Sequence, residues 1–380
     1  MHENARFFLT SQTRINILHL KQLKRGSVGD LKVTLKQIAD IAGVSRGTVD
    51  RAIHNREGVN PQVRERVLTV AESLGYTPNI AGKQLSARKL HLKLGVVLPP
   101  RRRGFWEDVY QGLDAVQEEL SDYGVTILCR PYEKYSAASQ LALIDQLLEE
   151  GMSGLAIAAV NDPSIQRRLN GLMEAGLPVV VVNSEIEHIA PLCYVGADYL
   201  FSGRTAAGIL GLIARRQHVE LMVFTGTNMM LSHTNRITGF LQELTRLETD
   251  CHLIDICKLF DSAEMSDEQQ AYQTAAARLR QHPETTAVFT AAGPVQIVAR
   301  AIRDTGMLGK VTHISFDLNT ETLPGLQDGS LTAVIGQEAF KQGYQPIKLL
   351  FDYLVNGMEP QDRRMILQNE IFIQQNAFLR

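Results

Sequence analysis

The stretch from residue 33 to residue 85 most constrains what this chain folds into, because turn-forming residues divide it into short helical runs. Apolar residues recur at helical spacing over 34–42, and Gly43 ends this predicted helix where a tight turn requires positive φ. Ser45 then caps a second predicted helix over 46–54. Two short helices joined by a glycine turn predict a helix-turn-helix, whose second helix is sized for the major groove of B-DNA.

The outward face of the second predicted helix is basic. Its apolar residues face inward, which leaves Arg46, Gly47, Asp50 and Arg51 on the outside. An arginine fork donates two parallel hydrogen bonds to the O6 and N7 atoms of guanine, a contact that discriminates between bases by about 1–3 kcal/mol. A third helix, predicted over 61–74 from its Asn-Pro start, completes a three-helix head.

Charge is distributed unevenly along the chain, although the whole sequence carries a formal charge of only −2. Residues 1–93 contain 16 Lys and Arg against 7 Asp and Glu, whereas the remainder contains 23 against 34. A basic front on an acidic body is typical of a DNA-binding head joined to a soluble ligand-binding module.

From residue 93 onward, continuous apolar strands alternate with helices. Two such series predict two doubly wound lobes, each a parallel sheet covered on both faces, with a cleft at the carboxyl ends of the strands. The expected domains are an N-terminal extension of poor order over 1–32, a head over 33–78, a hinge helix or linker over 79–92 and a two-lobed domain over 93–380. Lobe 1 is expected to comprise about 93–197 and 338–366, and lobe 2 about 198–337 and 367–380.

The head resembles that of the lactose-repressor (LacI/GalR) family of bacterial transcription regulators. The resemblance lies in the words TLKQIADIAGVSRGTVDR, GVNPQVRERVLTVAESLGYTPN and KQL. It implies that the start of the second helix contacts base edges and phosphates. The residues that match the family's DNA contacts are Ser45, Arg46, Gly47, Thr48 and Arg51, with Thr48 on phosphate.

The segment 79–89 resembles the family's hinge helix, which folds when two heads sit on an operator. Leu85 matches the leucine that wedges into the minor groove, and wedges of this kind kink DNA. Gly82 stands where relatives usually carry Ala, and glycine costs a helix interior roughly 0.5–1 kcal/mol. A linker hydrophobe is the alternative reading of Leu85.

The part from about 94 to 374 resembles the two-lobed (type I) periplasmic sugar-binding protein fold that the same family uses as its effector domain. The matching words are GFWEDVYQGL, VVVVNSE, YVGADYLFSGRTAAG, FTGTNMMLSHTNRITGF, ISFDLN and VIGQEAFKQGY. The resemblance implies a ligand between the lobes, stacked on aromatics and hydrogen-bonded at a polar rim. The implied effector-binding residues are Phe105, Trp106, Asn183, His233, Arg236, Asp317 and Gln337.

Three arginines, Arg101, Arg102 and Arg103, stand at the expected cleft mouth, where many relatives have Asn-Pro. Arginine forks suit carboxylates and phosphates, so an acidic or phosphorylated sugar is one possible effector. A solvated turn that does not touch the ligand is the alternative.

These features predict a sequence-specific regulator, by default a repressor, whose affinity for a pseudo-palindromic operator is controlled by a sugar-like effector. A two-fold operator requires a homodimer or tetramer. The rival classes are a sugar-binding component of transport or sensing and a non-specific DNA-binding protein.

Phosphate-binding, zinc-protease and hydrolase motifs are absent from the sequence, and the four cysteines have no CxxC spacing, so we expect no enzyme activity, cofactor or metal. With no signal peptide or membrane span in view, the expected location is the cytoplasm.

Overall fold

The computed structural model divides the chain into two compact units, and each is described by itself. The first comprises Met1–Lys89 with Asp352–Met358 and contains the head, and the second, the body, comprises Leu90–Phe351 with Glu359–Arg380. The structure describes residues 33–53, 58–74, 91–102, 104–215, 217–226, 230–259 and 268–378.

The head contains three helices, α2 (Leu35–Ala42), α3 (Arg46–Ile53) and α4 (Pro61–Ser73). A capping box fixes the start of α2, because the Gln37 N–H donates to the Thr34 hydroxyl and the Gln37 side chain accepts from the Thr34 N–H at 2.8 Å. Gly43 ends the helix at φ 65°. The three helices bury one apolar cluster, made of Ile38, Ala39, Ala42, Val49, Ala52, Val67, Val70, Ala71 and Leu74.

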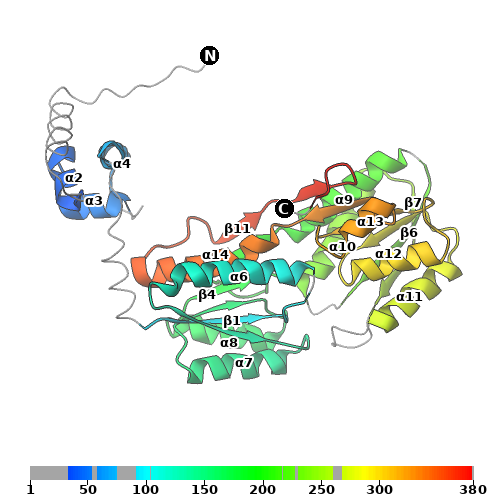
Figure 1. Ribbon diagram of the computed structural model, residues 1–380, viewed down its shortest axis with the longest axis horizontal. Coiled ribbons are helices and arrows are strands. Elements are labelled where there is room, and N and C mark those ends of the chain that lie inside the picture. Colours follow the sequence, from blue (N-terminus) through cyan, green and yellow to red (C-terminus); the bar gives the residue numbers. More distant parts are fainter. Residues whose placement is uncertain are drawn as a thin grey trace, which may run out of the picture. The chain divides into compact units, whose positions relative to one another are not determined.

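The body consists of two six-stranded sheets (Figure 1). Lobe 1 has the strand order β11-β5-β4-β3-β1-β2, and lobe 2 has the order β12-β10-β9-β8-β6-β7. The lobe 1 strands are β1 (Lys93–Leu98), β2 (Thr126–Pro131), β3 (Gly154–Ile157), β4 (Val179–Val182), β5 (Cys193–Ala197) and β11 (Arg364–Leu367). The lobe 2 strands are β6 (Val219–Thr225), β7 (Cys251–Lys258), β8 (Ala287–Thr290), β9 (Thr312–Phe316), β10 (Ala333–Gly336) and β12 (Glu370–Phe372).

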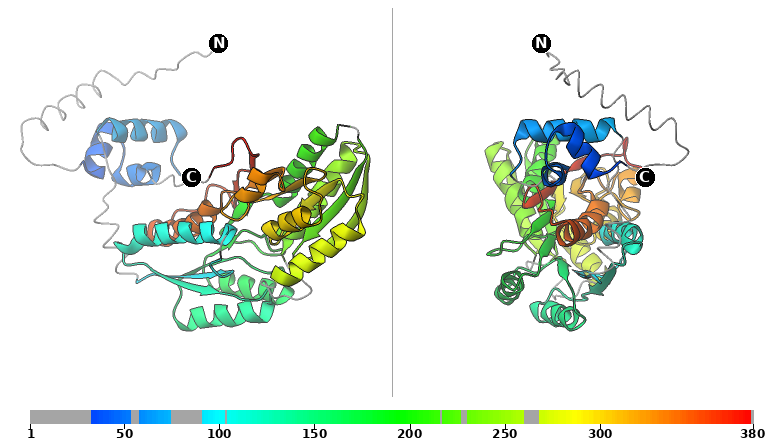
Figure 2. Two further views of the ribbon diagram at one scale, coloured as in Figure 1. Left: turned by 45° about the vertical axis from the view of Figure 1, so that its right-hand side comes forward. Right: turned by 90° about the vertical axis from the view of Figure 1, so that its left-hand side faces the viewer.

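Helices cover both faces of each sheet, as buried apolar strands require. In lobe 1, α7 (Ala137–Glu149) and α8 (Pro163–Glu174) lie on one face, and α6 (Phe105–Ser121) and α14 (Ala339–Asn356) on the other (Figures 1 and 2). In lobe 2, α9 (Tyr199–Ala214) and α10 (Leu231–Arg246) pack on one face, and α11 (Glu268–Gln281) and α12 (Val295–Asp304) on the other. The short helix α13 (Leu323–Asp328) follows β9.

The chain passes between the lobes at three crossing segments: Asp198, Gln337–Glu338 and Gln368–Asn369. These segments are tied to one another, since the Gln368 N–H donates to the Glu338 carboxylate at 3.0 Å and the Ser202 hydroxyl lies 3.0 Å from the Asn369 side-chain oxygen. Three adjacent crossings form a hinge about which two lobes can close.

The first two crossings lead into helices that pack closely on the lobe they enter. A Cβ atom at Gly203 of α9 would lie 2.0 Å from the Arg236 carbonyl oxygen of α10. A Cβ atom at Gly343 of α14 would lie 1.8 Å from the Val109 carbonyl oxygen of α6. Glycine is therefore required at both contacts, because any side chain would force the paired helices apart.

One strand departs from the all-parallel sheets expected from the sequence. β12 pairs with β10 in antiparallel orientation, with Ile371 opposite Ile335. β11 runs parallel to β5 and leaves lobe 1 at the cleft edge, only two residues before β12 begins. The chain therefore enters lobe 2 at the carboxyl ends of its strands and must run against them.

Candidate functional site

The exposed start of α3 gathers the five head residues predicted to contact DNA. The Thr48 N–H donates to the Ser45 hydroxyl at 3.1 Å, so Ser45 caps the helix as predicted. Arg46, Gly47 and Arg51 are exposed and Thr48 is half-buried. The Arg51 Nε atom donates to the Gly47 carbonyl at 3.2 Å, which holds its guanidinium along the outer face of α3. The hinge prediction for Gly82 and Leu85 lies outside the described residues.

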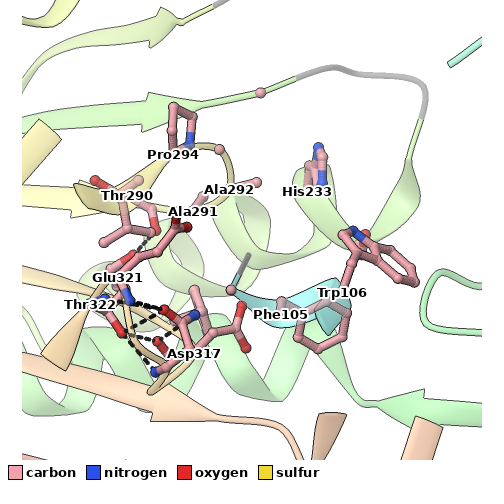
Figure 3. A pocket seen from close by; sticks show the side chains of 18 of the residues that line it. Phe105, Trp106, His233, Thr290, Ala291, Ala292, Pro294, Asp317, Glu321 and Thr322 are labelled. Carbon is pink, nitrogen blue, oxygen red and sulfur yellow. Dashed lines mark hydrogen bonds between the residues drawn. The ribbon is translucent and has the colours of Figure 1, made fainter. Parts of the chain in front are cut away.

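In the body, a cavity of about 560 Å³ lies between the two lobes at the carboxyl ends of the strands. We call it the interlobe cavity. All seven residues predicted to bind the effector line it. Lobe 1 provides Phe105, Trp106 and Asn183, lobe 2 provides His233, Arg236 and Asp317, and the second crossing segment provides Gln337. The labelled side chains of both lobes surround one open space (Figure 3).

Two aromatic rings form the lobe 1 wall of the interlobe cavity. Phe105 and Trp106 are the first residues of α6, directly after Gly104 at φ 87°, and their ring centroids lie 5.1 Å apart at an interplanar angle of 84°. The rings therefore present two nearly perpendicular surfaces. Aromatic faces of this kind pack against the C–H faces of sugar rings.

The polar end of the cavity centres on Asp317, which follows β9 at φ 68°. Burial in the cleft raises the pKa of Asp317 to about 6, while Arg236 and Gln337 favour its charged form. The Gln337 Nε2 atom donates to the carboxylate at 2.7 Å and fixes its orientation. The carboxylate is still partly accessible from the cavity, so it can accept further hydrogen bonds.

Arg236 lies deep at the same end of the cavity. Its Nη1 atom donates to the Ala291 carbonyl at 2.9 Å, and its guanidinium carbon lies 3.7 Å from the ring centroid of Phe316. Among the described residues, Arg236 Nε and Gln337 Oε1 are buried without a hydrogen-bond partner. Both atoms belong to residues that line the cavity beside Asp317, and a buried donor or acceptor without a partner is rare in folded proteins.

Asn183 takes part in the hinge as well as in the cavity wall. Its Nδ2 atom donates to the Tyr199 hydroxyl at 2.8 Å and to the Gln342 side-chain oxygen at 3.0 Å. Gln342 in turn donates to the Gln337 carbonyl at 2.9 Å. A buried hydrogen-bond network thus connects the polar end of the cavity to the first two crossing segments.

The arginines near the cavity mouth have acidic partners. Arg101 binds Glu107 and Asp114 along α6, with closest nitrogen–oxygen distances of 2.8 and 2.7 Å, and it does not line the cavity. Arg102 lines the cavity and pairs with Glu133 at 3.2 Å, and Arg103 is outside the described residues. The carboxylates of Glu268, Asp317 and Glu321 also line the cavity. This balance of charge does not favour an anionic ligand.

Sequence reasoning missed two loops of the cavity wall. Residues 291–294, after β8, are small or apolar, and Asn319 and Thr322, after β9, turn back on Asp317. The Thr322 hydroxyl donates to the Asp317 carbonyl at 2.5 Å and helps to hold its unusual backbone conformation. Their position directly after parallel strands was the available signal, because the carboxyl ends of such strands meet at one edge.

Across the described ranges, no three His, Cys, Asp or Glu side chains form a group that could hold a metal ion. In the same part of the chain, no helix is long and apolar enough to cross a membrane.

Comparisons with known proteins match both units. Residues 34–79 match the model of the lacI family of bacterial regulatory proteins, and residues 94–358 match a periplasmic binding protein domain. The chain is 24% identical to the HTH-type transcriptional regulator CelR of Thermobifida fusca over 362 residues, which cover 90% of this chain and 98% of that protein. It is 23% identical to catabolite control protein A of Priestia megaterium, over 85% of this chain and 93% of that protein.

Solved structures share the fold of the body. A solute-binding protein of Burkholderia graminis, in complex with D-arabinose, superposes with a TM-score of 0.67 at 21% identity, over 75% of this chain and 96% of that one. A LacI-type transcriptional regulator of Bacteroides fragilis superposes with a TM-score of 0.66 at 22% identity, over 75% of this chain and 98% of that one.

Proposed function

The chain belongs to the lacI family of bacterial regulatory proteins, and from this premise we propose how its two units work together. It is a DNA-binding transcription regulator, and a neutral sugar bound in the interlobe cavity controls its affinity for an operator. By default it acts as a repressor, as a homodimer or tetramer on a pseudo-palindromic site, because two-fold proteins match two-fold sites.

One observation carries the effector half of this proposal: Arg236 and Gln337, which line the cavity beside the Asp317 carboxylate and opposite two aromatic rings, each have a buried polar atom without a hydrogen-bond partner, Nε and Oε1. Alternating donors and acceptors match the hydroxyls of a sugar ring, and the aromatic wall matches its apolar face. A neutral sugar is favoured over the acidic or phosphorylated one, because the cavity's arginines have partners and three carboxylates line its wall.

The effector half is tested by a thermal-shift screen of the full chain against neutral monosaccharides, disaccharides, uronic acids and sugar phosphates. The neutral sugars should contain the strongest stabiliser, since a ligand that binds only the folded state raises its stability. Trp106 is the only tryptophan, so its fluorescence should change with the same sugar. A screen in which only sugar phosphates stabilise the protein would contradict the neutral-sugar assignment.

The DNA half is tested with a variant of α3. Selection from a random DNA library gives the operator, and Arg51→Ala should then weaken operator binding by about 1–3 kcal/mol while random DNA is affected much less. The matched control is Arg66→Ala, which removes the same charge from the exposed surface of α4. An equal loss on operator and random DNA would mean that Arg51 contacts only phosphate, and binding without any sequence preference would favour the non-specific class.

A further inference from the structure

The first turn of α10 belongs to lobe 2 but is capped by lobe 1. The residue before the helix, Met230, makes no side-chain capping bond of its own. Instead, the Ser232 N–H donates at 3.1 Å to the hydroxyl of Ser184, which lies just after β4. Ser184 is 0% exposed and Ser232 is 2% exposed, so this hydrogen bond between the lobes is closed to water.

Two side chains of the same turn also pack on lobe 1. Met230 is 2% exposed and belongs to the apolar cluster formed by β1, β3, β4, α7 and α8. The His233 ring meets the Tyr135 ring of lobe 1 edge to face, with ring centroids 6.4 Å apart at 79°. Neighbouring residues of one turn therefore contact lobe 1 through a hydrogen bond, an apolar insertion and a ring contact.

We propose that this turn is an interlobe latch, and that Ser184 is a positioning residue for the interlobe cavity. Arg236 lies one helical turn beyond Ser232, and its guanidinium borders the cavity. When Ser184 caps Ser232, it therefore also fixes Arg236 relative to lobe 1. The relevance of the latch to an effector rests on the proposed function, but the latch itself does not.

Opening of the lobes would break all three contacts together. The Ser232 N–H would lose its partner, and Met230 would leave an apolar core for water. Both costs fall on the open form only, so the latch favours the closed form in the absence of any ligand. A ligand that requires closure then binds more tightly, because a larger fraction of the protein is already in the binding form.

The test uses the full chain without sugar or DNA, so its outcome is independent of the effector screen. Trp106 lies on lobe 1 and lines the cavity, so its quenching by acrylamide reports on opening. Ser184→Ala removes the acceptor and Met230→Ala removes the apolar insertion. Each should raise the Stern–Volmer constant of Trp106 by about twofold. Ser330→Ala is the matched control, because it removes a buried hydroxyl within lobe 2 and away from the cavity.

Amide hydrogen exchange separates a latch from a simple helix cap. Under the proposal, Ser184→Ala speeds exchange in the first turn of α10 and also raises Trp106 quenching. Faster exchange with unchanged quenching would overturn it, because Ser184 would then only cap the helix. Equal quenching in all three variants would also overturn it, as a sign of general destabilisation. If Ser184→Ala does not fold, the Trp106 quenching of Met230→Ala is compared with that of Ser330→Ala. Higher quenching in Met230→Ala supports the latch, and equal quenching in the two variants overturns it.

Discussion

At the scale of single residues, we expect Asp317 to make effector binding depend on pH. Burial raises its pKa to about 6 from an ordinary value of 3.8. Sugar hydroxyls donate to a carboxylate, so binding favours the ionised form. We therefore expect calorimetry to show affinity for the sugar found in the screen rising from pH 5 to pH 7 and then levelling. At pH 5, about one pH unit below the pKa, the affinity should be about tenfold lower than the plateau.

Asp317→Asn provides the control, because an amide has no charge to lose over this range. The variant should bind the sugar more weakly and with a flat pH profile. Asp114→Asn, which changes an acid on α6 outside the cavity, should keep the wild-type profile. An affinity that falls as pH rises would contradict the account, since the protonated carboxyl would then be the donor.

The sequence predicted which residues line the cavity better than it predicted what each one does. Phe105, Asp317 and Gln337 could be placed there, because they match a family pattern and lie at the ends of strands or the starts of helices. The sequence did not predict that Asn183 donates both amide hydrogens to hinge residues. Its partners, Tyr199 and Gln342, are distant in sequence. That one polar atom each of Arg236 and Gln337 is buried without a hydrogen-bond partner likewise follows only from three-dimensional packing.

At the scale of elements, the close contact of α9 with α10 should distinguish two glycines of one helix. A Cβ atom at Gly203 would lie 2.0 Å from the Arg236 carbonyl oxygen, whereas one at Gly208 would meet nothing within 4 Å. Gly203→Ala should therefore lower the free energy of unfolding by about 1–3 kcal/mol or more. Gly208→Ala should raise it by about 0.5–1 kcal/mol, because alanine favours the helix.

Urea unfolding of the two variants beside the wild type measures both effects. Opposite signs support the requirement for glycine at the helix contact, and Gly203→Ala should also weaken sugar binding because it displaces Arg236. Equal stability of Gly203→Ala and the wild type would mean that α9 can move away from α10 without cost.

Local sequence signals sufficed for most elements. Gly43 and Ser45 act at the helix ends predicted for them, because caps and turns depend on neighbouring residues. The orientation of β12 could not be predicted in the same way. It depends on where β11 leaves lobe 1, and β11 is placed by its pairing with β5, far away in the sequence.

At the scale of the whole molecule, we propose that the interlobe cavity controls the head. Coupling requires that the sugar bind the DNA-competent and DNA-released forms with different affinity. The second crossing segment supplies a physical basis, because Asn183 in the cavity wall donates to Gln342 and Gln342 donates to the Gln337 carbonyl. We therefore expect occupancy of the cavity to be linked to the arrangement of the lobes.

The most direct test is operator binding, measured by fluorescence anisotropy with and without the sugar that binds in the screen, for the wild type and Asp317→Ala. Saturating sugar should change the operator affinity of the wild type by about 5- to 150-fold, the usual range for allosteric coupling. Asp317→Ala should bind the operator as tightly as the wild type but should not respond to that sugar concentration. A sugar that binds tightly without altering operator affinity, or an Asp317→Ala variant that responds like the wild type, would contradict the proposal.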